Sequence, residues 1–557
     1  MPSYEFFLAG PLEKVFADRR PAPFSHPEIT ALKGDVPAFQ LVYSVEESRG
    51  ESLRAAVEGI KSELYSVRLV PSLLPCPAVR DTNYLRTEPG LFPDLLTPSD
   101  GNITPVEGQF RSLWIRIPTE NAEPGSHPVT VRVFSGAGEL LFQEKIKVWI
   151  LPVELPEQTL LHTEWFHADC LANYYHVPPF GAFYWQTVEN FIRFAARRCG
   201  VNVLLTPVFT PPLDTEEGRE RTDVQLVDIE KKGGRYRFGF EKLKRWCGIC
   251  RKFGIERLEI PPLFTQWGAK ATPNIYAEEN GSRTRIFGWD VPSGSPKYRG
   301  FLKQFLPQLV SCLNDLGFPK KNLYFHLSDE PSKANLENYA AARKQAADLL
   351  EGLPVIDALS DFSCYESGIV RHPVVATSAV EPFLEHHVPD LWVYYCCGQG
   401  VDVPNRFFST PSARNRMMGI LMYRFRIHGF LHWGYNFYSS RLSRRAIDPY
   451  AVTDGDCGFP SGDPFLVYPA QDGTPYSSIR NEVQMEGLAD MRALTLLEQM
   501  TDRKEVESLL ERGLSAPLSF RRYPHSAAWL LRVREKVNLE IAALRKVPFG
   551  QPDPGER

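Results

Sequence analysis

The sequence Asn322-Leu-Tyr-Phe-His-Leu-Ser-Asp-Glu-Pro331 begins as an aromatic and apolar run and ends on two adjacent acids, Asp329 and Glu330. An apolar run of this length predicts a buried strand. Because Pro331 disfavours a helical backbone at the residue before it, we predict that Glu330 is extended and lies at the strand's last position. Barrel enzymes carry their catalytic residues at such strand ends. The alternative is a polar loop that only leads into the next helix.

Strands that alternate with helices flank this stretch on both sides. Amphipathic segments of helical spacing separate the apolar runs, and an insertion near 224–238 has the pattern of a hairpin. Eight strand–helix units predict a (β/α)8 barrel of the TIM type, which we assign to residues 156–500. Its expected strands cover 160–166, 202–206, 257–260, 322–330, 355–359, 374–377, 391–396 and 429–436.

The segment before residue 156 has a different pattern. Short alternating runs at 39–43, 113–117 and 129–134 are separated by Pro, Gly and Asn, and a glycine-containing turn leads into a long run at 140–149. We therefore predict an N-terminal β-sandwich domain over residues 1–155. The last part, 501–557, carries two helical patterns and predicts a short helical tail.

Composition narrows the classes of function. The 557 residues carry 63 Lys and Arg against 67 Asp and Glu, a net charge of −4 without a basic block, so nucleic acid is a poor candidate partner. We find no apolar run that could span a bilayer and no secretory signal at the N-terminus, and expect a cytoplasmic protein without membrane insertion. The 10 cysteines are scattered, and Cys247 and Cys250 lack a second pair. The sequence therefore predicts neither a metal site nor an organic cofactor, and it leaves the oligomeric state open.

Aromatic, amide and acidic residues gather where the predicted barrel strands end. Since these ends converge in one mouth, the side chains should share a pocket. Indole faces stack on sugar rings, while amides and acids bind hydroxyls, so the set favours a carbohydrate substrate, a small oligosaccharide or a glycoconjugate. Besides Asp329 and Glu330, the candidate substrate-binding residues are Trp165, His167, Gln266, Trp267, Asp361, Tyr395, Trp433, Tyr435 and Asn436.

The position of the acids limits the mechanism. A retaining glycosidase with a protein nucleophile needs two carboxyl groups about 5–5.5 Å apart, on opposite sides of the anomeric carbon. Sequence neighbours cannot easily straddle a sugar, and the predicted seventh strand ends Tyr-Tyr-Cys-Cys-Gly at 394–398 without an acid. The nucleophile would then be the substrate's own 2-acetamido oxygen, which forms an oxazolinium ion. One carboxyl would act as acid and base, and its ionised neighbour would hold the acetamido N–H.

The same segments resemble glycoside hydrolase family 123, the β-N-acetylgalactosaminidases. The matching residues run through most of the predicted barrel: Phe-Thr-Pro-Pro-Leu-Asp-Thr at 209–215, Leu-Phe-Thr-Gln-Trp-Gly-Ala at 263–269, His-Leu-Ser-Asp-Glu-Pro at 326–331, Tyr-Tyr-Cys-Cys-Gly at 394–398 and the strand at 429–436. The resemblance implies that Glu330 is the general acid and base and that Asp329 orients and polarises the acetamido group. It implies a retaining exo-enzyme that removes terminal β-linked 2-acetamido sugars, above all N-acetylgalactosamine.

Two other readings stay open at this point. A glycosidase of other specificity could use Asp361 or Glu164 as a second carboxylate. A barrel without catalysis could serve carbohydrate binding through the N-terminal sandwich.

Overall fold

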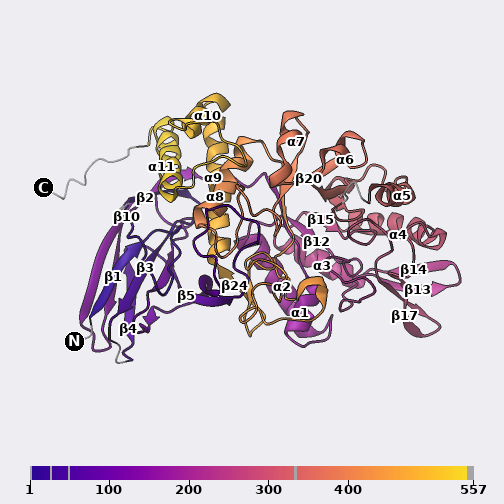
Figure 1. The fold of residues 1–557 in the computed structure, drawn as a ribbon, viewed down its shortest axis with the longest axis horizontal. Coiled ribbons are helices and arrows are strands. Elements are labelled where there is room, and N and C mark those ends of the chain that lie inside the picture. Colours follow the sequence, from indigo (N-terminus) through magenta and orange to yellow (C-terminus); the bar gives the residue numbers. More distant parts are fainter. Residues whose placement is uncertain (1–2, 26–27, 48–49, 331–334, 548–557) are drawn as a thin grey trace.

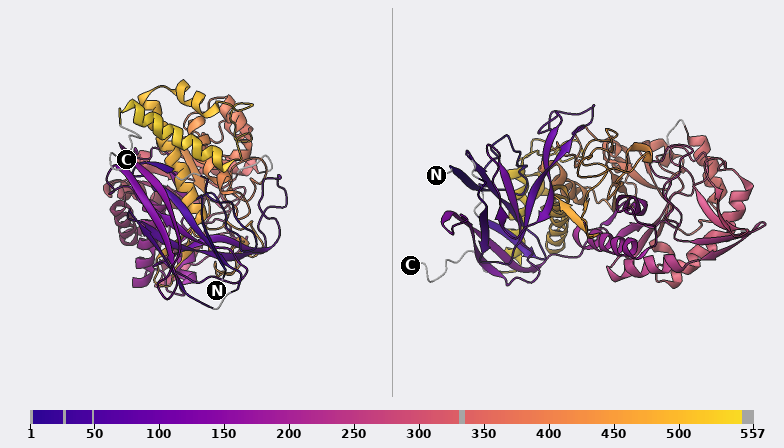
Figure 2. Two further views of the ribbon diagram at one scale, coloured as in Figure 1. Left: turned by 90° about the vertical axis from the view of Figure 1, so that its left-hand side faces the viewer. Right: turned by 90° about the horizontal axis from the view of Figure 1, so that it is seen from below.

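The computed structural model describes residues 3–25, 28–47, 50–330 and 335–547. Two β-sheets at one end of the elongated molecule pack face to face, as the alternating N-terminal pattern predicted (Figures 1 and 2). One buried apolar cluster takes side chains from both, among them Leu41 and Val131. The first sheet orders β1 (Tyr4–Ala9), β3 (Ala38–Val45), β8 (Arg111–Arg116), β5 (Glu63–Ser72), β6 (Gly90–Pro98), β24 (Pro475–Ser478) and β23 (Tyr468–Pro469). The second orders β2 (Glu28–Lys33), β10 (Leu140–Glu154), β9 (Gly125–Phe134), β4 (Leu53–Glu58) and β7 (Asn102–Ile103).

The first of these sheets crosses the expected domain boundary at residue 155. Strands β23 and β24 come from the long segment after the last predicted barrel strand, and β24 pairs antiparallel with β6. At the start of the next helix, the buried Arg480 donates two hydrogen bonds to Asp94, at 2.8 and 2.9 Å. No local pattern in the sequence signals this long-range pairing, and the bounds 1–155, 156–500 and 501–557 stay a prediction.

Two parallel sheets form the middle of the molecule, and together they contain a counterpart of every predicted barrel strand. The five-stranded sheet orders β11 (Leu161–Glu164), β22 (Gly429–His432), β21 (Trp392–Tyr394), β20 (His372–Ala376) and β19 (Ile356–Leu359). The three-stranded sheet orders β12 (Val203–Leu205), β15 (Arg257–Ile260) and β18 (Leu323–Phe325).

The edges of these two sheets meet on both sides. The amide of Asn202 donates to the carbonyl of His162 at 3.0 Å, which joins the segments of β12 and β11. A parallel bridge pairs Phe325 with Val355, next to β18 and β19. A single buried cluster also draws side chains from both sheets, including Leu205 and Val374. The chain is thus a mixed α/β fold in which two parallel sheets contribute side chains to one apolar cluster.

Helices lie outside the parallel strands, and others cover the sandwich (Figure 1). The helices of the central part are α1 (Ala168–Tyr174), α2 (Ala182–Arg198), α3 (Glu241–Lys252), α4 (Pro296–Asp315), α5 (Leu336–Ala346), α6 (Phe362–Glu366), α7 (Glu381–Glu385), α8 (Ser412–Arg424) and α9 (Ile479–Met500). Short 3-10 turns are η1 (Lys320–Asn322), η2 (Thr377–Ala379) and η3 (Arg441–Ser443). The predicted helical tail contains α10 (Arg503–Glu511) and α11 (Ala527–Leu544).

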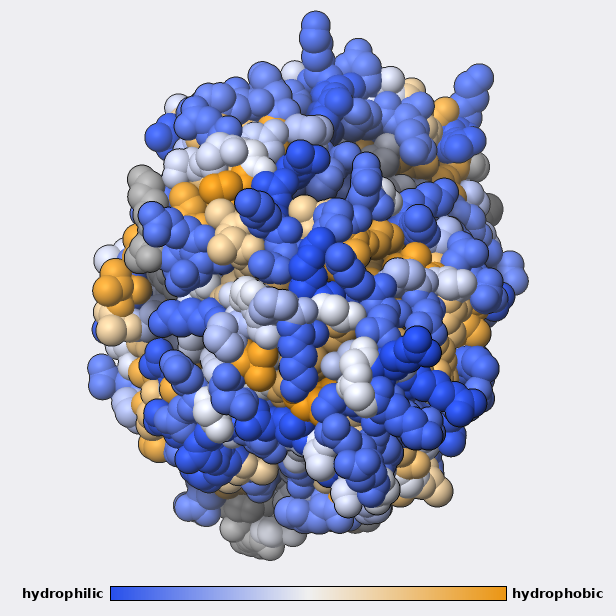
Figure 3. All heavy atoms as spheres, turned by 90° about the vertical axis from the view of Figure 1, so that its right-hand side faces the viewer, coloured by the Kyte–Doolittle hydropathy of each residue, from blue (hydrophilic) through white to orange (hydrophobic). Residues whose placement is uncertain are grey.

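A small sheet projects from the end opposite the sandwich. It orders β14 (Arg235–Gly239), β13 (Asp228–Lys232), β16 (Ile275–Glu279) and β17 (Ser282–Phe287), so the predicted hairpin gains a second one. Hydrophilic side chains cover most of this end of the molecule, with only scattered apolar ones between them (Figure 3). Among the described residues, no helix is both long and apolar enough to cross a membrane, and no group of three His, Cys, Asp or Glu side chains is placed to hold a metal ion.

Candidate active site

The acid pair lies beyond the end of its strand. Strand β18 stops at Phe325, so Asp329 and Glu330 belong to the loop that follows it. Glu330 has a φ of 46° and is therefore left-handed rather than extended, which corrects the prediction from sequence. Pro331, on which that prediction rested, lies outside the described residues. A left-handed backbone at a residue with a side chain costs about 1–3 kcal/mol, and such strain gathers at functional sites.

A tyrosine from the neighbouring sheet holds Glu330. The hydroxyl of Tyr394, the last residue of β21, donates to Glu330 Oε1 at 2.8 Å. Burial and the charge of Glu330 raise the pKa of Tyr394 well above its ordinary value, so this phenol is a donor at any working pH. Two loops that are 64 residues apart in sequence are thereby fixed to each other at the carboxyl ends of their strands.

Replacing Tyr394 by Phe tests this contact. A hydrogen bond to a charged group contributes about 1.5–3 kcal/mol, so we expect kcat/KM to fall roughly 10- to 100-fold. Tyr395→Phe is the matched control, because the Tyr395 hydroxyl lies 3.5 Å from Asn415 Oδ1, on α8. Steady-state kinetics of both variants measure kcat/KM. An equal fall of kcat/KM in the two variants would contradict the role of Tyr394 in holding Glu330.

A row of buried charged side chains lies next to the loop that carries the acid pair. Glu259 of β15 accepts hydrogen bonds from Trp165 Nε1 at 2.7 Å and from His326 Nε2 at 2.5 Å, and His326 Nδ1 faces Asp357 Oδ1 at 3.4 Å. Burial opposes a charge on His326, but its hydrogen bonds to Asp357 and Glu259 raise its pKa to about 10. Asp357 also accepts from the amide of Leu327 at 3.1 Å. A cationic His326 between two carboxylates therefore anchors the loop that carries the acids.

The surroundings of Asp329 favour its protonated form. Burial and the charge of Glu330 raise the pKa of Asp329 well above its ordinary value, although His326 opposes this effect. The charge of Asp214 raises the Asp329 pKa further. Burial in turn raises the pKa of Asp214 itself to about 6, while the Leu442 amide, which donates to Asp214 Oδ2 at 2.8 Å, lowers it. The raised pKa is that of Asp329, the acid that the resemblance assigns to the acetamido group.

The three candidate tryptophans differ in their exposure and in their contacts. Trp165 is 5% exposed and belongs, like Trp433, to the apolar cluster inside the parallel strands. The Trp433 ring is half-buried and is fixed by a 3.0 Å hydrogen bond from Nε1 to Asp463 Oδ2. Trp267 is 46% exposed, and its amide donates to the carbonyl of Asp329 at 3.1 Å. Of the three, Trp267 is the exposed one, and its backbone is tied directly to the loop that carries the acids.

Tyr395 and Tyr435 are not brought to the acid pair. Both are buried, and their side chains point toward the surrounding helices. The Tyr435 hydroxyl donates to the carbonyl of Phe191, on α2, at 2.9 Å. Successive residues of a strand face opposite sides, so Tyr394 points to the interior and Tyr395 away from it.

Four other candidates support the local structure. The Asn436 side chain is tied to the backbone of His167, with bonds of 2.9 and 3.1 Å. His167 Nε2 donates to the carbonyl of Trp433 at 2.8 Å. Asp361 caps α6 by accepting from the amide of Ser363. Gln266 is buried and donates to the Thr215 carbonyl, while its Oε1 has no hydrogen-bond partner among the described residues.

Glu164 is fully engaged with a buried arginine. Arg406 donates to its two carboxylate oxygens at 2.6 and 2.9 Å, and Gln484 donates to Oε1 at 2.9 Å. Burial would raise the pKa of Glu164, but the charge of Arg406 lowers it below its ordinary range. Such a carboxylate stays ionised and paired, so it holds the strands together and is not positioned as a second catalytic group.

Several residues of the site were missed by the sequence argument. Strand alternation could have indicated that Tyr394, rather than Tyr395, faces the interior. Asp214 belongs to the segment 209–215, which is one of those that resemble the family. Asp463, which holds Trp433, lies 30 residues from its partner in a segment without regular structure. No sequence pattern identifies a residue of that kind.

Two comparisons with known proteins found matches, and a third found none. The family model described as glycoside hydrolase 123, catalytic domain, matches residues 165–497. A family 123 glycoside hydrolase from Clostridium perfringens, studied for glycolipid glycan hydrolysis, superposes with a TM-score of 0.75 at 16% identity, covering 98% of this chain and 99% of that one. β-Glucuronidases from Parabacteroides merdae and Ruminococcus gnavus match with TM-scores of only 0.29 and 0.26, at 9% identity. They cover 89% and 87% of this chain, and 51% and 69% of their own chains. No curated protein matches the sequence.

Proposed function

Since the chain belongs to glycoside hydrolase family 123, we propose that this glycoside hydrolase is a retaining exo-enzyme that removes terminal β-linked 2-acetamido sugars, above all N-acetylgalactosamine. Its nucleophile is the acetamido oxygen of the substrate, which forms an oxazolinium ion. The likeness to an enzyme studied for glycolipid glycan hydrolysis supports a glycan that is part of a glycoconjugate.

The adjacency of the two acids is the observation that carries this proposal. Asp329 and Glu330 come from one loop, and Tyr394 holds Glu330 from the next sheet. The sequence suggested two residues as a second carboxylate on the opposite side of the anomeric carbon. Both have other partners: Glu164 pairs with Arg406, and Asp361 caps a helix. A sugar with its own nucleophile needs no carboxylate there.

We assign the roles of the two acids as the resemblance to family 123 implies them. Glu330, oriented by Tyr394, protonates the leaving oxygen and then activates water. Asp329 holds the acetamido N–H and offsets the positive charge that develops on the ring. Burial favours a protonated Asp329 in the free enzyme, and the arriving N–H, whose charge grows in the transition state, favours the ionised form. Trp433 stacks under the sugar, and the free Oε1 of Gln266 is available to one hydroxyl.

We also propose that the parallel strands close into a (β/α)8 barrel. The contacts between β11 and β12, the bridge from Phe325 to Val355 and the shared apolar cluster support a ring in chain order. The site would then occupy the barrel mouth formed by the carboxyl ends of the strands.

A panel of three nitrophenyl glycosides tests the mechanism. We expect β-N-acetylgalactosaminide to be cleaved fastest and β-N-acetylglucosaminide more slowly. The β-galactoside has no acetamido nucleophile, so its kcat/KM should be lower by at least roughly 10³-fold, well within the ~10⁵ M or more that well-placed internal nucleophiles reach. A thiazoline analogue of the cyclic intermediate should inhibit competitively. Comparable hydrolysis of the galactoside would rule out substrate assistance.

A second candidate is a glycosidase in which Asp214 serves as the second carboxylate, since this buried carboxyl has a pKa of about 6 and acts on Asp329. The Asp214→Asn variant distinguishes the substrate-assisted mechanism from one with Asp214 as the second carboxylate. In the substrate-assisted enzyme it removes a charge that raises the pKa of Asp329, so the acidic limb of the kcat/KM profile should move to lower pH, with near-normal activity at about pH 7. Loss of turnover at every pH would favour the second candidate.

The Asp214→Asn protein should also be more stable at neutral pH. The fold raises the pKa of Asp214 from 3.8 to about 6, so stability is lost as pH rises through that window. The substituted side chain can still accept from the Leu442 amide and carries no charge, which predicts a gain of about 2 kcal/mol at roughly pH 7 and none at roughly pH 4. Denaturant unfolding of both proteins at the two pH values measures this difference in the free energy of unfolding.

A further inference from the structure

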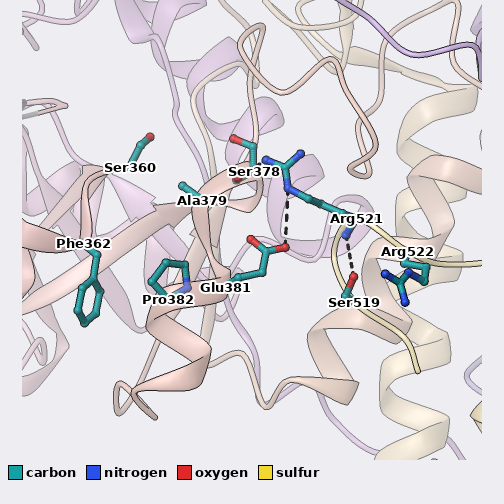
Figure 4. A pocket seen from close by; sticks show the side chains of 9 residues that line it. All are labelled: Ser360, Phe362, Ser378, Ala379, Glu381, Pro382, Ser519, Arg521 and Arg522. Carbon is teal, nitrogen blue, oxygen red and sulfur yellow. Dashed lines mark hydrogen bonds and ion pairs between the residues drawn. The ribbon is translucent and has the colours of Figure 1, made fainter. Parts of the chain in front are cut away.

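A hollow of about 580 Å³ lies beyond the carboxyl ends of β19 and β20 and has no role in the chemistry described so far (Figure 4). Its volume falls within the ~300–1,000 Å³ of small-molecule sites. We call it the arginine hollow; its lining residues are Ser360, Phe362, Ser378, Ala379, Glu381, Pro382, Ser519, Arg521 and Arg522.

The arginine hollow is linked to the general acid through Ser360 and Tyr394. Ser360 directly follows β19, and its hydroxyl is hydrogen-bonded to Tyr394, which in turn donates to Glu330 at 2.8 Å. On the other side, Gln399 Nε2 donates to Ser378 Oγ at 3.3 Å, and its Oε1 accepts from the amide of Cys396 at 2.8 Å. Because the general acid faces the glycosidic oxygen, the hollow lies on the side toward which the leaving sugar extends.

The lining changes character from one end to the other. Phe362 and Pro382 lie at one end in Figure 4, and the arginines at the opposite end. The half-buried Phe362 ring is braced by Phe383, with ring centres 5.0 Å apart. An aromatic face followed by hydroxyls suits a sugar ring.

Cationic charge exceeds anionic charge in the arginine hollow. Arg521 donates to the Ser378 carbonyl at 2.5 Å, and its Nε lies 3.9 Å from Glu381, too far for a hydrogen bond. The Arg522 guanidinium is exposed, and none of the described residues forms a hydrogen bond or ion pair with it. One positive charge is therefore left to face a ligand.

The loop that presents these arginines is anchored on both sides. Ser519 and Arg522 exchange backbone hydrogen bonds of 2.9 and 3.2 Å. Phe520 between them is fully buried and stacks on Phe425, with ring centres 5.4 Å apart, and Tyr523 is 8% exposed. A held loop loses little freedom when a ligand binds, which favours a recognition role for the helical tail.

We propose that the arginine hollow binds an anionic group, a carboxylate or a sulfate ester, on the sugar that Glu330 releases. Arginine forks pair with planar or tetrahedral anions through two hydrogen bonds at once. This inference rests on the proposed function, because it takes the leaving sugar to lie on the Glu330 side.

The test compares three β-N-acetylgalactosaminyl disaccharides with the full-length protein, one with galactose as leaving sugar, one with galactose sulfate and one with glucuronate. We expect KM to be roughly 10-fold lower for at least one anionic disaccharide than for the neutral one, and the difference to shrink in high salt. The doubly substituted Arg521→Gln, Arg522→Gln protein should lose the difference, while Arg532→Gln, an exposed arginine on α11, should keep it. A nitrophenyl N-acetylgalactosaminide, which has no second sugar, should be cleaved equally by all three proteins.

A binding measurement separates this proposal from the proposed function. Calorimetry of the Glu330→Gln protein with the same disaccharides reports affinity without turnover. Preference for the sulfate alone or the glucuronate alone identifies the anion and supports the proposal. Equal affinity for all three disaccharides, or a preference that survives loss of both arginines, overturns it. If no disaccharide is cleaved by the unsubstituted protein, the proposed function fails, and the calorimetry still decides the ligand of the hollow.

Discussion

Glu330→Gln is expected to lower kcat/KM for a disaccharide or methyl glycoside by roughly 10²–10⁴-fold, the range that a positioned general acid contributes. A sugar or methanol leaves only when its oxygen is protonated, and Gln cannot supply that proton. A dinitrophenolate leaves without help, so its release should be nearly unaffected. The second step still needs a base for water, and turnover of the dinitrophenyl substrate should therefore stall at the cyclic intermediate.

Azide tests the role of Glu330 as the base of the second step. It attacks the intermediate without a base, so it should restore turnover of the dinitrophenyl substrate by Glu330→Gln and give the β-glycosyl azide. Glu337→Gln is the matched control, because it makes the same change on the exposed face of α5. Stopped-flow release of dinitrophenolate and analysis of the azide product measure both steps. An equal loss for good and poor leaving groups would assign Glu330 a role other than acid and base.

The order of the elements could be predicted because it depends on local pattern. The strand expected at 257–260 is β15 (Arg257–Ile260), and the eighth, expected at 429–436, begins where β22 (Gly429–His432) begins. Apolar periodicity and turn residues act over a few residues. They can therefore be recognised without knowing which distant segment the element packs against. The acid pair was proposed in the same way, since two acids after an apolar run stand out.

What could not be predicted depends on contacts between distant segments. Arg406 pairs with Glu164 across 242 residues, and that pairing removes Glu164 from the set of free carboxylates. The addition of β24 to the sandwich is another such contact. Glu330 reaches a left-handed backbone because the surrounding loop requires it, against the local preference set by Pro331. Tyr394 was open to inference, but choosing between two adjacent tyrosines required the exact phase of the strand.

Asp329→Asn is expected to reduce kcat/KM by about 10²–10³-fold, the size of effect seen when one preorganised contact to developing charge is removed. Asn keeps the shape of the side chain but cannot offset the positive charge of the oxazolinium ion. Because that charge develops in both chemical steps, the loss should be similar for dinitrophenyl and methyl glycosides, and azide should not restore turnover. This pattern is the opposite of that expected for Glu330→Gln.

The pH profile gives an independent readout of the same variant. In the unsubstituted enzyme Asp329 has a raised pKa through burial and the charge of Glu330, so activity should fall as pH drops and Asp329 takes up a proton. Removing the Asp329 carboxyl should therefore eliminate one ionisation from the acidic limb of kcat/KM. Asp315→Asn, on an exposed carboxylate at the end of α4, should leave the profile unchanged. If Asp329→Asn retains the full acidic limb, or slows only substrates with poor leaving groups, Asp329 does not polarise the acetamido group and the cyclic intermediate loses its support.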